Sequence, residues 1–224
     1  FEILRVSKYN GKSRVKDPMD DSLVPVMNKN ELDEIAEQFL RTHYKKALLE
    51  PTWIDPIELA NGMGLTVRYE HITQDGSVFG RSYFCDCQTD LYNPQTDEVY
   101  QELIPAGTVL VDKKTAFLSV LGSVHNPIVH ECVHWDKHKK AFALVRLYDN
   151  SLSNIGCKVV GGIAGNRRDA VDWMEWQANA LAPRIQMPMS MFKKKVEQLI
   201  SKYRREMKLY DMIGEPRYFI KHKL

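Results

Sequence analysis

The sequence lacks the features that place a chain outside the ordinary globular proteins. No apolar run approaches the ~20 residues that a membrane-spanning helix needs. There are no internal repeats or low-complexity blocks, and no charged start followed by an apolar core marks a signal peptide. The sequence also has no large excess of basic or acidic residues. The 31 basic residues stand against 29 acidic ones, and the net charge of +2 does not favour a general nucleic-acid binder.

The composition that remains is close to the globular average. Hydrophobic residues make up 44% and charged residues 27% of the 224 residues, which excludes collagen-like and wholly disordered chains. A chain of this length can bury well over half of its unfolded surface without disulfide staples. We therefore expect one domain, with at most a small appendage.

Cysteine is scarce, with four residues and no CxxC pair. Cys85 and Cys87 form a CxC pair, which on a strand would point both thiols to one face. We interpret the cysteines as reduced packing residues of a cytosolic protein. A metal or redox role for the CxC pair is the alternative.

Hydrophobic periodicity predicts two helices in the first third of the chain. Residues 30–49 place apolar side chains at helical spacing, and Asn30 is the expected N-cap. A second, short helix is expected to begin at Asp55 and to end at Gly62 or Gly64.

Strands are predicted between these helices and the helical second half. Alternation predicts strands over residues 65–70, 78–85 and 108–111, with an irregular stretch over residues 93–107. The elements do not follow a strict βαβ order. We therefore expect an α+β domain, mainly helical, with a small and mostly antiparallel three-stranded sheet.

Residues 130–134 read His-Glu-Cys-Val-His, the HExxH pattern of zinc proteases. Residues four apart on a helix share a face at about 6 Å, so His130 and His134 can converge on one Zn²⁺. Glu131 lies about 100° round the helix, where its carboxylate can reach and activate a metal-bound water. Asn126 and Pro127 are expected to start this helix. The alternative is a chance cluster whose members satisfy one another by hydrogen bonds.

His138 follows His134 by four residues but lies about 12 Å along the helix from His130, so it cannot join them on one ion. Its charged neighbours predict that it faces solvent. The metzincin pattern is not met either, because Lys137 and Lys140 occupy the required glycine and histidine positions.

The third ligand is expected on a helix over residues 169–182, closed by Pro183. Glu175 is the only glutamate there and is the predicted ligand, with Asp172 as the rival. Asn179 is a candidate for orienting a ligand imidazole from outside the ligand set. Ordinary packing polarity is the alternative for Asn179.

Two motifs together resemble the ImmA/IrrE family of metallopeptidases. The HExxH at 130–134 is followed by Glu-Trp-Gln-Ala-Asn-Ala-Leu-Ala at 175–182 and then by Met187 and Pro188. The resemblance covers about residues 30–190. It implies a zincin-like metallopeptidase domain over this range, after an N-terminal arm (1–29) and before a C-terminal amphipathic helix and tail (191–224). Within the last region, the helix is expected over residues 192–210.

The family likeness also implies roles and a setting. Zinc would be held by His130, His134 and Glu175, and Glu131 would be the catalytic base. Family members act in the bacterial cytoplasm and cleave transcriptional repressors, so the expected partner is a helix-turn-helix repressor rather than a membrane or a nucleic acid. The alternative is a non-catalytic module that keeps the peptidase fold and sequesters a regulator. Cys132 and an insertion over residues 149–168 depart from the family pattern.

Overall fold

The computed structural model describes residues 23–114, 121–148, 154–158 and 170–203. The described helices are α1 (Leu32–His43), α2 (Pro56–Gly62), α4 (Leu121–Val133), α5 (Lys139–Tyr148), α6 (Ala170–Gln186) and α7 (Met189–Lys202). The strands are β1 (Thr66–Glu70), β2 (Val78–Tyr83), β3 (Cys87–Asn93), β4 (Glu98–Ile104), β5 (Thr108–Asp112) and β6 (Asn154–Lys158). The turns η1 (Lys29–Glu31), η2 (Lys45–Leu48) and η3 (His134–His138) complete the set, and η3 is π-helical.

The predicted α+β class and the mostly antiparallel sheet are confirmed. The main sheet has the order β1-β5-β2-β6, in which β1 and β5 are parallel and the other pairs antiparallel. Its first three members are the three predicted strands. β6 comes from the predicted insertion and adds an edge next to β2. The rest of that insertion and the arm over residues 1–22 lie outside the described residues.

The expectation of an irregular stretch over residues 93–107 was wrong. β3 and β4 form an antiparallel hairpin with the register Cys87↔Ile104 to Asn93↔Glu98. Most side chains of β4 are exposed, including Val99 and Leu103. An exposed strand carries no alternation of buried and polar residues, so the pattern was invisible in the sequence.

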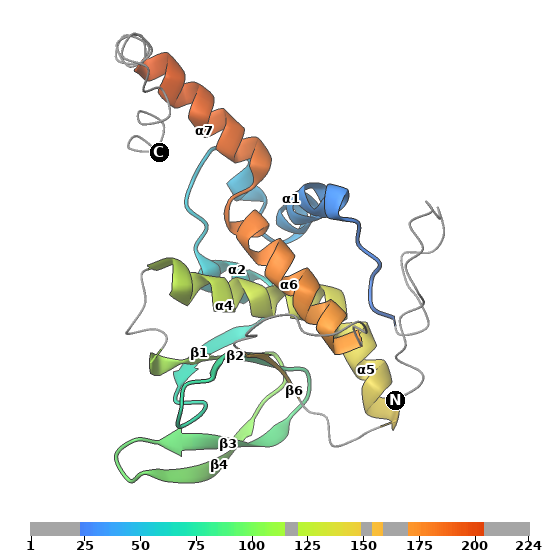
Figure 1. Cartoon of the computed structure of the whole chain (residues 1–224), viewed down its shortest axis with the longest axis vertical. Helices are drawn as coiled ribbons and strands as arrows, with labels where there is room; N and C mark the ends of the chain where they lie inside the picture. Colours follow the sequence, from blue (N-terminus) through green and yellow to red (C-terminus); the bar gives the residue numbers. More distant parts are fainter. Residues whose placement is uncertain (1–22, 115–120, 149–153, 159–169, 204–224) are drawn as a thin grey trace.

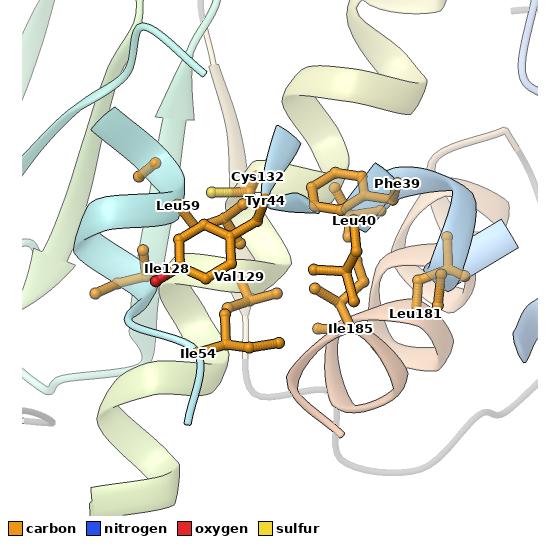
Figure 2. Close-up of a cluster of buried hydrophobic side chains, with 14 of the residues drawn as sticks. Phe39, Leu40, Tyr44, Ile54, Leu59, Ile128, Val129, Cys132, Leu181 and Ile185 are labelled. Atoms are coloured by element: carbon orange, nitrogen blue, oxygen red, sulfur yellow. The ribbon is translucent and has the colours of Figure 1, made fainter. Parts of the chain in front are cut away.

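Figure 1 shows α4 lying across one face of the main sheet, with the β3–β4 hairpin on the other side and α7 projecting from the body of the molecule. The main core lies between α4 and the helices α1, α2 and α6. Figure 2 shows Ile128, Val129 and Cys132 of α4 in this core, near Leu181 and Ile185 of α6. Each fully buried aliphatic side chain there contributes about 1.5–3 kcal/mol to folding. The core therefore fixes α4, which carries His130 and Glu131, against α6, which carries Glu175.

The first helix is shorter than the prediction over residues 30–49. It ends at His43, because Tyr44 leaves helical geometry (φ −149°), and the chain continues in η2. The N-cap is Glu31 and not Asn30, since a 3₁₀ turn precedes the helix. The prediction for α2 is confirmed, because the side chain of Asp55 accepts hydrogen bonds from the first backbone amides.

Two prolines predicted as helix boundaries lie inside helices. α4 begins before Asn126 and Pro127, and α6 continues past Pro183 to Gln186. A hydrogen bond joins the two helices near these prolines, because Nε2 of Gln186 donates to Oδ1 of Asn126. The same nitrogen also donates to the carbonyl of Ala182. The expected cap at Asn126 and the expected stop at Pro183 were therefore wrong.

α7 begins at Met189 and none of its residues is buried. The predicted C-terminal helix is confirmed as far as residue 202, and residues 204–224 lie outside the described residues. Across the part of the chain that the structure describes, no helix combines the length and apolarity needed to cross a membrane.

Candidate metal centre

The end of α4 and the first residue of the π-helical turn η3 bring two imidazoles together. Nε2 of His130 and Nε2 of His134 are 2.9 Å apart, as expected for residues on one helix face. Both side chains are fully buried. The two rings meet edge to face, with centroids 4.7 Å apart.

α6 supplies a carboxylate to the same point. Oε2 of Glu175 lies 3.2 Å from Nε2 of His130, and Oε1 lies 3.2 Å from Nε2 of His134. The structure therefore brings together the three residues predicted as ligands. The rival Asp172 is exposed and does not belong to this cluster. Packing of α4 on α6 through the main core explains how residues so far apart in sequence meet.

The charge on Glu175 is stabilised by the two histidines beside it. Burial raises the pKa of Glu175, but contacts with His130 and His134 outweigh burial and hold that pKa well below its usual value. Glu175 is therefore an anion facing two imidazole nitrogens. Among the described residues, neither of its carboxylate oxygens has a conventional hydrogen-bond donor.

The donor set fits a metal ion. A tetrahedral site with ligand bonds of ~2.0–2.1 Å places its donor atoms about 3.3 Å apart, close to the separations of 2.9 to 3.2 Å seen here. Three electron-rich atoms so close together repel one another unless a proton or a cation lies among them. The cluster of His130, His134 and Glu175 can hold a metal ion.

Glu131 leaves α4 on the side that faces the sheet. Its carboxylate accepts a hydrogen bond at Oε2 from Oγ of Ser82 on β2. Burial raises the pKa of Glu131, against the opposing effects of His134, His130 and Ser82. Within the described residues, Oε1 has no hydrogen-bond partner. Glu131 is thus a buried carboxylate beside the cluster but not part of it, with one oxygen held and one unpaired.

Gly80, two residues before Ser82, lies against the Glu131 carboxylate. A Cβ atom at position 80 would lie 3.1 Å from Oε1 and 3.3 Å from Cγ of Glu131. β2 therefore approaches α4 so closely that a side chain at residue 80 would push the Glu131 carboxylate aside by a few tenths of an ångström. Sequence reasoning missed both Gly80 and Ser82. The available signal was a glycine inside a predicted strand, which often marks a close backbone approach.

The prediction that His138 faces solvent was wrong, because its side chain is fully buried. Its Nδ1 lies 2.9 Å from Nδ1 of His134, on the side of that ring away from the ligand cluster, and its Nε2 lies 2.9 Å from Oε1 of Gln177. The π-helical turn η3 keeps His138 on the buried side of the helix. The neighbouring charges separate from it, since Lys137 pairs with Asp136 and Lys139 is exposed.

Asn179 is exposed, and the contact that orients His134 comes from His138. The geometry therefore gives no support to the role predicted for Asn179. Among the described residues, no disulfide joins Cys85, Cys87 or Cys132, and Cys132 packs in the main core, where burial raises its pKa. Its position after Glu131 has a packing explanation.

Comparison with known proteins assigns no family. No protein-family model matches the chain, and neither curated proteins nor solved structures show significant similarity to it. What is known of the site is therefore its geometry.

Proposed function

We propose that this protein is a zinc-dependent endopeptidase in which His130, His134 and Glu175 hold the zinc ion and Glu131 is the general base. The observation that carries the proposal is the convergence of two imidazoles and one carboxylate on a single point, beside a fourth buried group with a free oxygen. Two histidines and a glutamate are a ligand set of catalytic zinc sites, which keep one coordination position open. A structural site would favour four protein ligands.

The chemistry divides between the ion and the chain. Zinc in such a site supplies a Lewis acid that polarises the scissile carbonyl and lowers the pKa of water toward about 7. Glu131 accepts the proton of the attacking water and later delivers it to the leaving amine. Burial raises the pKa of this carboxyl, which suits a group that must both take and return a proton. Ser82 holds Oε2 of Glu131 in place, and Oε1 has no hydrogen-bond partner among the described residues and can accept the proton.

The sheet offers a place for an extended substrate. Strands β2 and β5 are interior, so β1 and β6 are the edges of the four-stranded order. β6 lies next to β2, whose Ser82 touches Glu131, whereas β5 separates β1 from β2. Among the described strands β6 is at the edge, and a peptide that adds to it by main-chain hydrogen bonds would lie one strand away from the residue that contacts Glu131.

The substrate class follows from the resemblance to ImmA/IrrE peptidases. We propose that the protein acts in the cytoplasm on a helix-turn-helix repressor, by regulatory proteolysis. A purified repressor from the same genome is incubated with the zinc-loaded protein, and fragments are sought by mass spectrometry. Glu131→Gln is expected to retain zinc and lose cleavage, while Glu197→Gln, on the exposed surface of α7, is expected to behave like the unsubstituted protein.

The experiment also tests the other function considered. If the zinc-loaded protein binds the repressor and leaves it intact, the chain is a sequestering module with a peptidase fold. Cleavage that is unchanged in Glu131→Gln would reject the role given to that carboxylate.

A further inference from the structure

A chain of hydrogen bonds connects His134 to the backbone ahead of α1. Nδ1 of His134 lies 2.9 Å from Nδ1 of His138, and Nε2 of His138 lies 2.9 Å from Oε1 of Gln177. Nε2 of Gln177 in turn donates to the carbonyl of Pro25 over 2.5 Å. The side chains of His134, His138 and Gln177 are all buried, and the link to the half-buried Pro25 is partly shielded from water.

The last acceptor sets the direction of every bond in the chain. A carbonyl oxygen only accepts, so the amide nitrogen of Gln177 faces Pro25 and the amide oxygen faces His138. That oxygen also only accepts, so Nε2 of His138 carries a proton. Among the described residues, the ring nitrogens of His138 contact His134 and Gln177 and no carboxylate. A neutral imidazole that carries its proton on Nε2 has a lone pair on Nδ1.

This lone pair fixes the state of the ligand. Nδ1 of His134 must donate to it, so the proton of a neutral His134 is on Nδ1 and the lone pair of Nε2 points at His130 and Glu175. This is the tautomer that a metal ligand through Nε2 requires. An outer partner of this kind also fixes the angle of the ring and raises the basicity of the ligand nitrogen.

We propose that His138 and Gln177 are positioning residues, which form a relay from the Pro25 carbonyl that holds His134 in the Nδ1–H tautomer and so prepares the site for its metal ion. The proposal deepens the proposed function and rests on it for the metal. The relay itself is a property of the metal-free protein.

The first test reads the protons directly. Nitrogen-15 NMR of the metal-free protein, with histidine signals assigned by single substitutions, distinguishes the two neutral tautomers of each ring. The relay predicts Nδ1–H for His134 and Nε2–H for His138. The opposite tautomer at either ring, or a charged His138 at neutral pH, would overturn the proposal.

The second test measures affinity for Zn²⁺ alone, by competition with a chromophoric chelator. Gln177→Met keeps the size of the side chain and removes both of its hydrogen bonds. The expected loss of affinity is about 10- to 100-fold, typical of the loss of an outer partner. Gln186→Met is the matched control, because Gln186 lies on the same helix and is also hydrogen-bonded, but to Asn126 and Ala182 and not to a histidine. It is expected to bind Zn²⁺ as tightly as the unsubstituted protein.

A pair of variants at position 138 guards against a general loss of folding. His138→Asn keeps an acceptor close to the place of Nδ1, and His138→Leu has none. The relay predicts that the asparagine variant retains more Zn²⁺ affinity than the leucine variant, at similar thermal stability. Equal affinity in Gln177→Met, Gln186→Met and the unsubstituted protein would reject the relay.

The outcomes separate the two proposals. If the unsubstituted protein shows the expected tautomers but binds no Zn²⁺, the proposed function fails and the relay stands. If it binds Zn²⁺ tightly but shows the opposite tautomers, the relay fails and the proposed function stands.

Discussion

The backbone of Gly80 on β2 lies against the carboxylate of Glu131 on α4, so closely that a Cβ atom at position 80 would be 3.1 Å from Oε1. This oxygen is the one without a hydrogen-bond partner in the described part of the chain. β2 thus limits where Oε1 of Glu131 can move. This contact links the geometry of the sheet to the proposed proton transfer.

The first prediction concerns that contact. Gly80→Ala is expected to displace the Glu131 carboxylate by a few tenths of an ångström and to lower kcat about tenfold or more, with a stability cost of about 1–3 kcal/mol from overpacking. Zn²⁺ binding should be retained, since the ligands are not touched. Steady-state kinetics and zinc titration check both points. Gly62→Ala is the control, because a Cβ there meets only the carbonyl oxygen of His43 at 3.6 Å, an ordinary contact.

The second prediction concerns the metal. Removing metal with a chelator is expected to lower the melting temperature, and Zn²⁺ at about 100 times its Kd should restore about 2.7 kcal/mol of stability. Glu175→Ala is expected to reduce this gain strongly, because it removes one of three donors. Differential scanning fluorimetry with and without Zn²⁺ measures it.

Asp172→Ala is the matched control for that experiment, since Asp172 lies one turn earlier on the same helix and is exposed. It is expected to keep the full zinc-dependent gain. A lost gain in Asp172→Ala with a retained one in Glu175→Ala would transfer the ligand role to Asp172.

The third prediction concerns pH and a charged cluster on the sheet. Glu70 contacts Arg68 at 3.0 Å and Lys113 at 3.1 Å. Burial raises the pKa of Glu70, but these two cations outweigh it and bring the pKa below the usual 4.5. A lowered pKa stabilises the fold above the pKa of the unfolded chain, and the contribution is lost as the pH falls through the folded value.

Glu70→Gln is therefore expected to lower the free energy of unfolding near neutral pH by less than about 1 kcal/mol, since Glu70 and its two cationic partners are partly exposed. The difference from the unsubstituted protein should shrink as the pH falls through the folded pKa of Glu70. Urea denaturation at neutral pH and at a series of acid pH values measures it, with the exposed Glu98→Gln as the comparison. A difference that grows toward acid would show the opposite sign and reject the argument.

The fourth prediction concerns the core that joins the two site helices. Leu181 on α6 is fully buried, and Leu181→Ala is expected to cost about 2–5 kcal/mol and to weaken Zn²⁺ binding, because α6 carries Glu175. Leu147 on α5 is 80% exposed, so Leu147→Ala should be nearly neutral. Thermal denaturation and zinc titration of both variants provide the measurement.

Local sequence patterns predicted the parts of the site that depend on one helix. The spacing of His130 and His134 determines that they share a face, whatever surrounds them. Glu175 could be predicted because a single glutamate stands among apolar and aromatic residues on a helix. Both predictions could be made without knowledge of how the helices pack.

The features that sequence reasoning missed depend on packing between distant elements. His138 was assigned to solvent from its charged neighbours, but the π-helical turn and Gln177 bury it. Ser82 meets Glu131 only because β2 lies under α4. The prolines at 127 and 183 mark helix ends in isolated chains, whereas tertiary packing carries both helices through them.

The link between Gln177 and the carbonyl of Pro25 has a practical consequence. The stretch ahead of the first helix is where purification tags are commonly joined and where trimming is usually thought harmless. Here that stretch is connected by hydrogen bonds, through Gln177 and His138, to His134, a proposed zinc ligand. Preparations that differ only in their leading residues should therefore be compared for zinc content before their activities are compared.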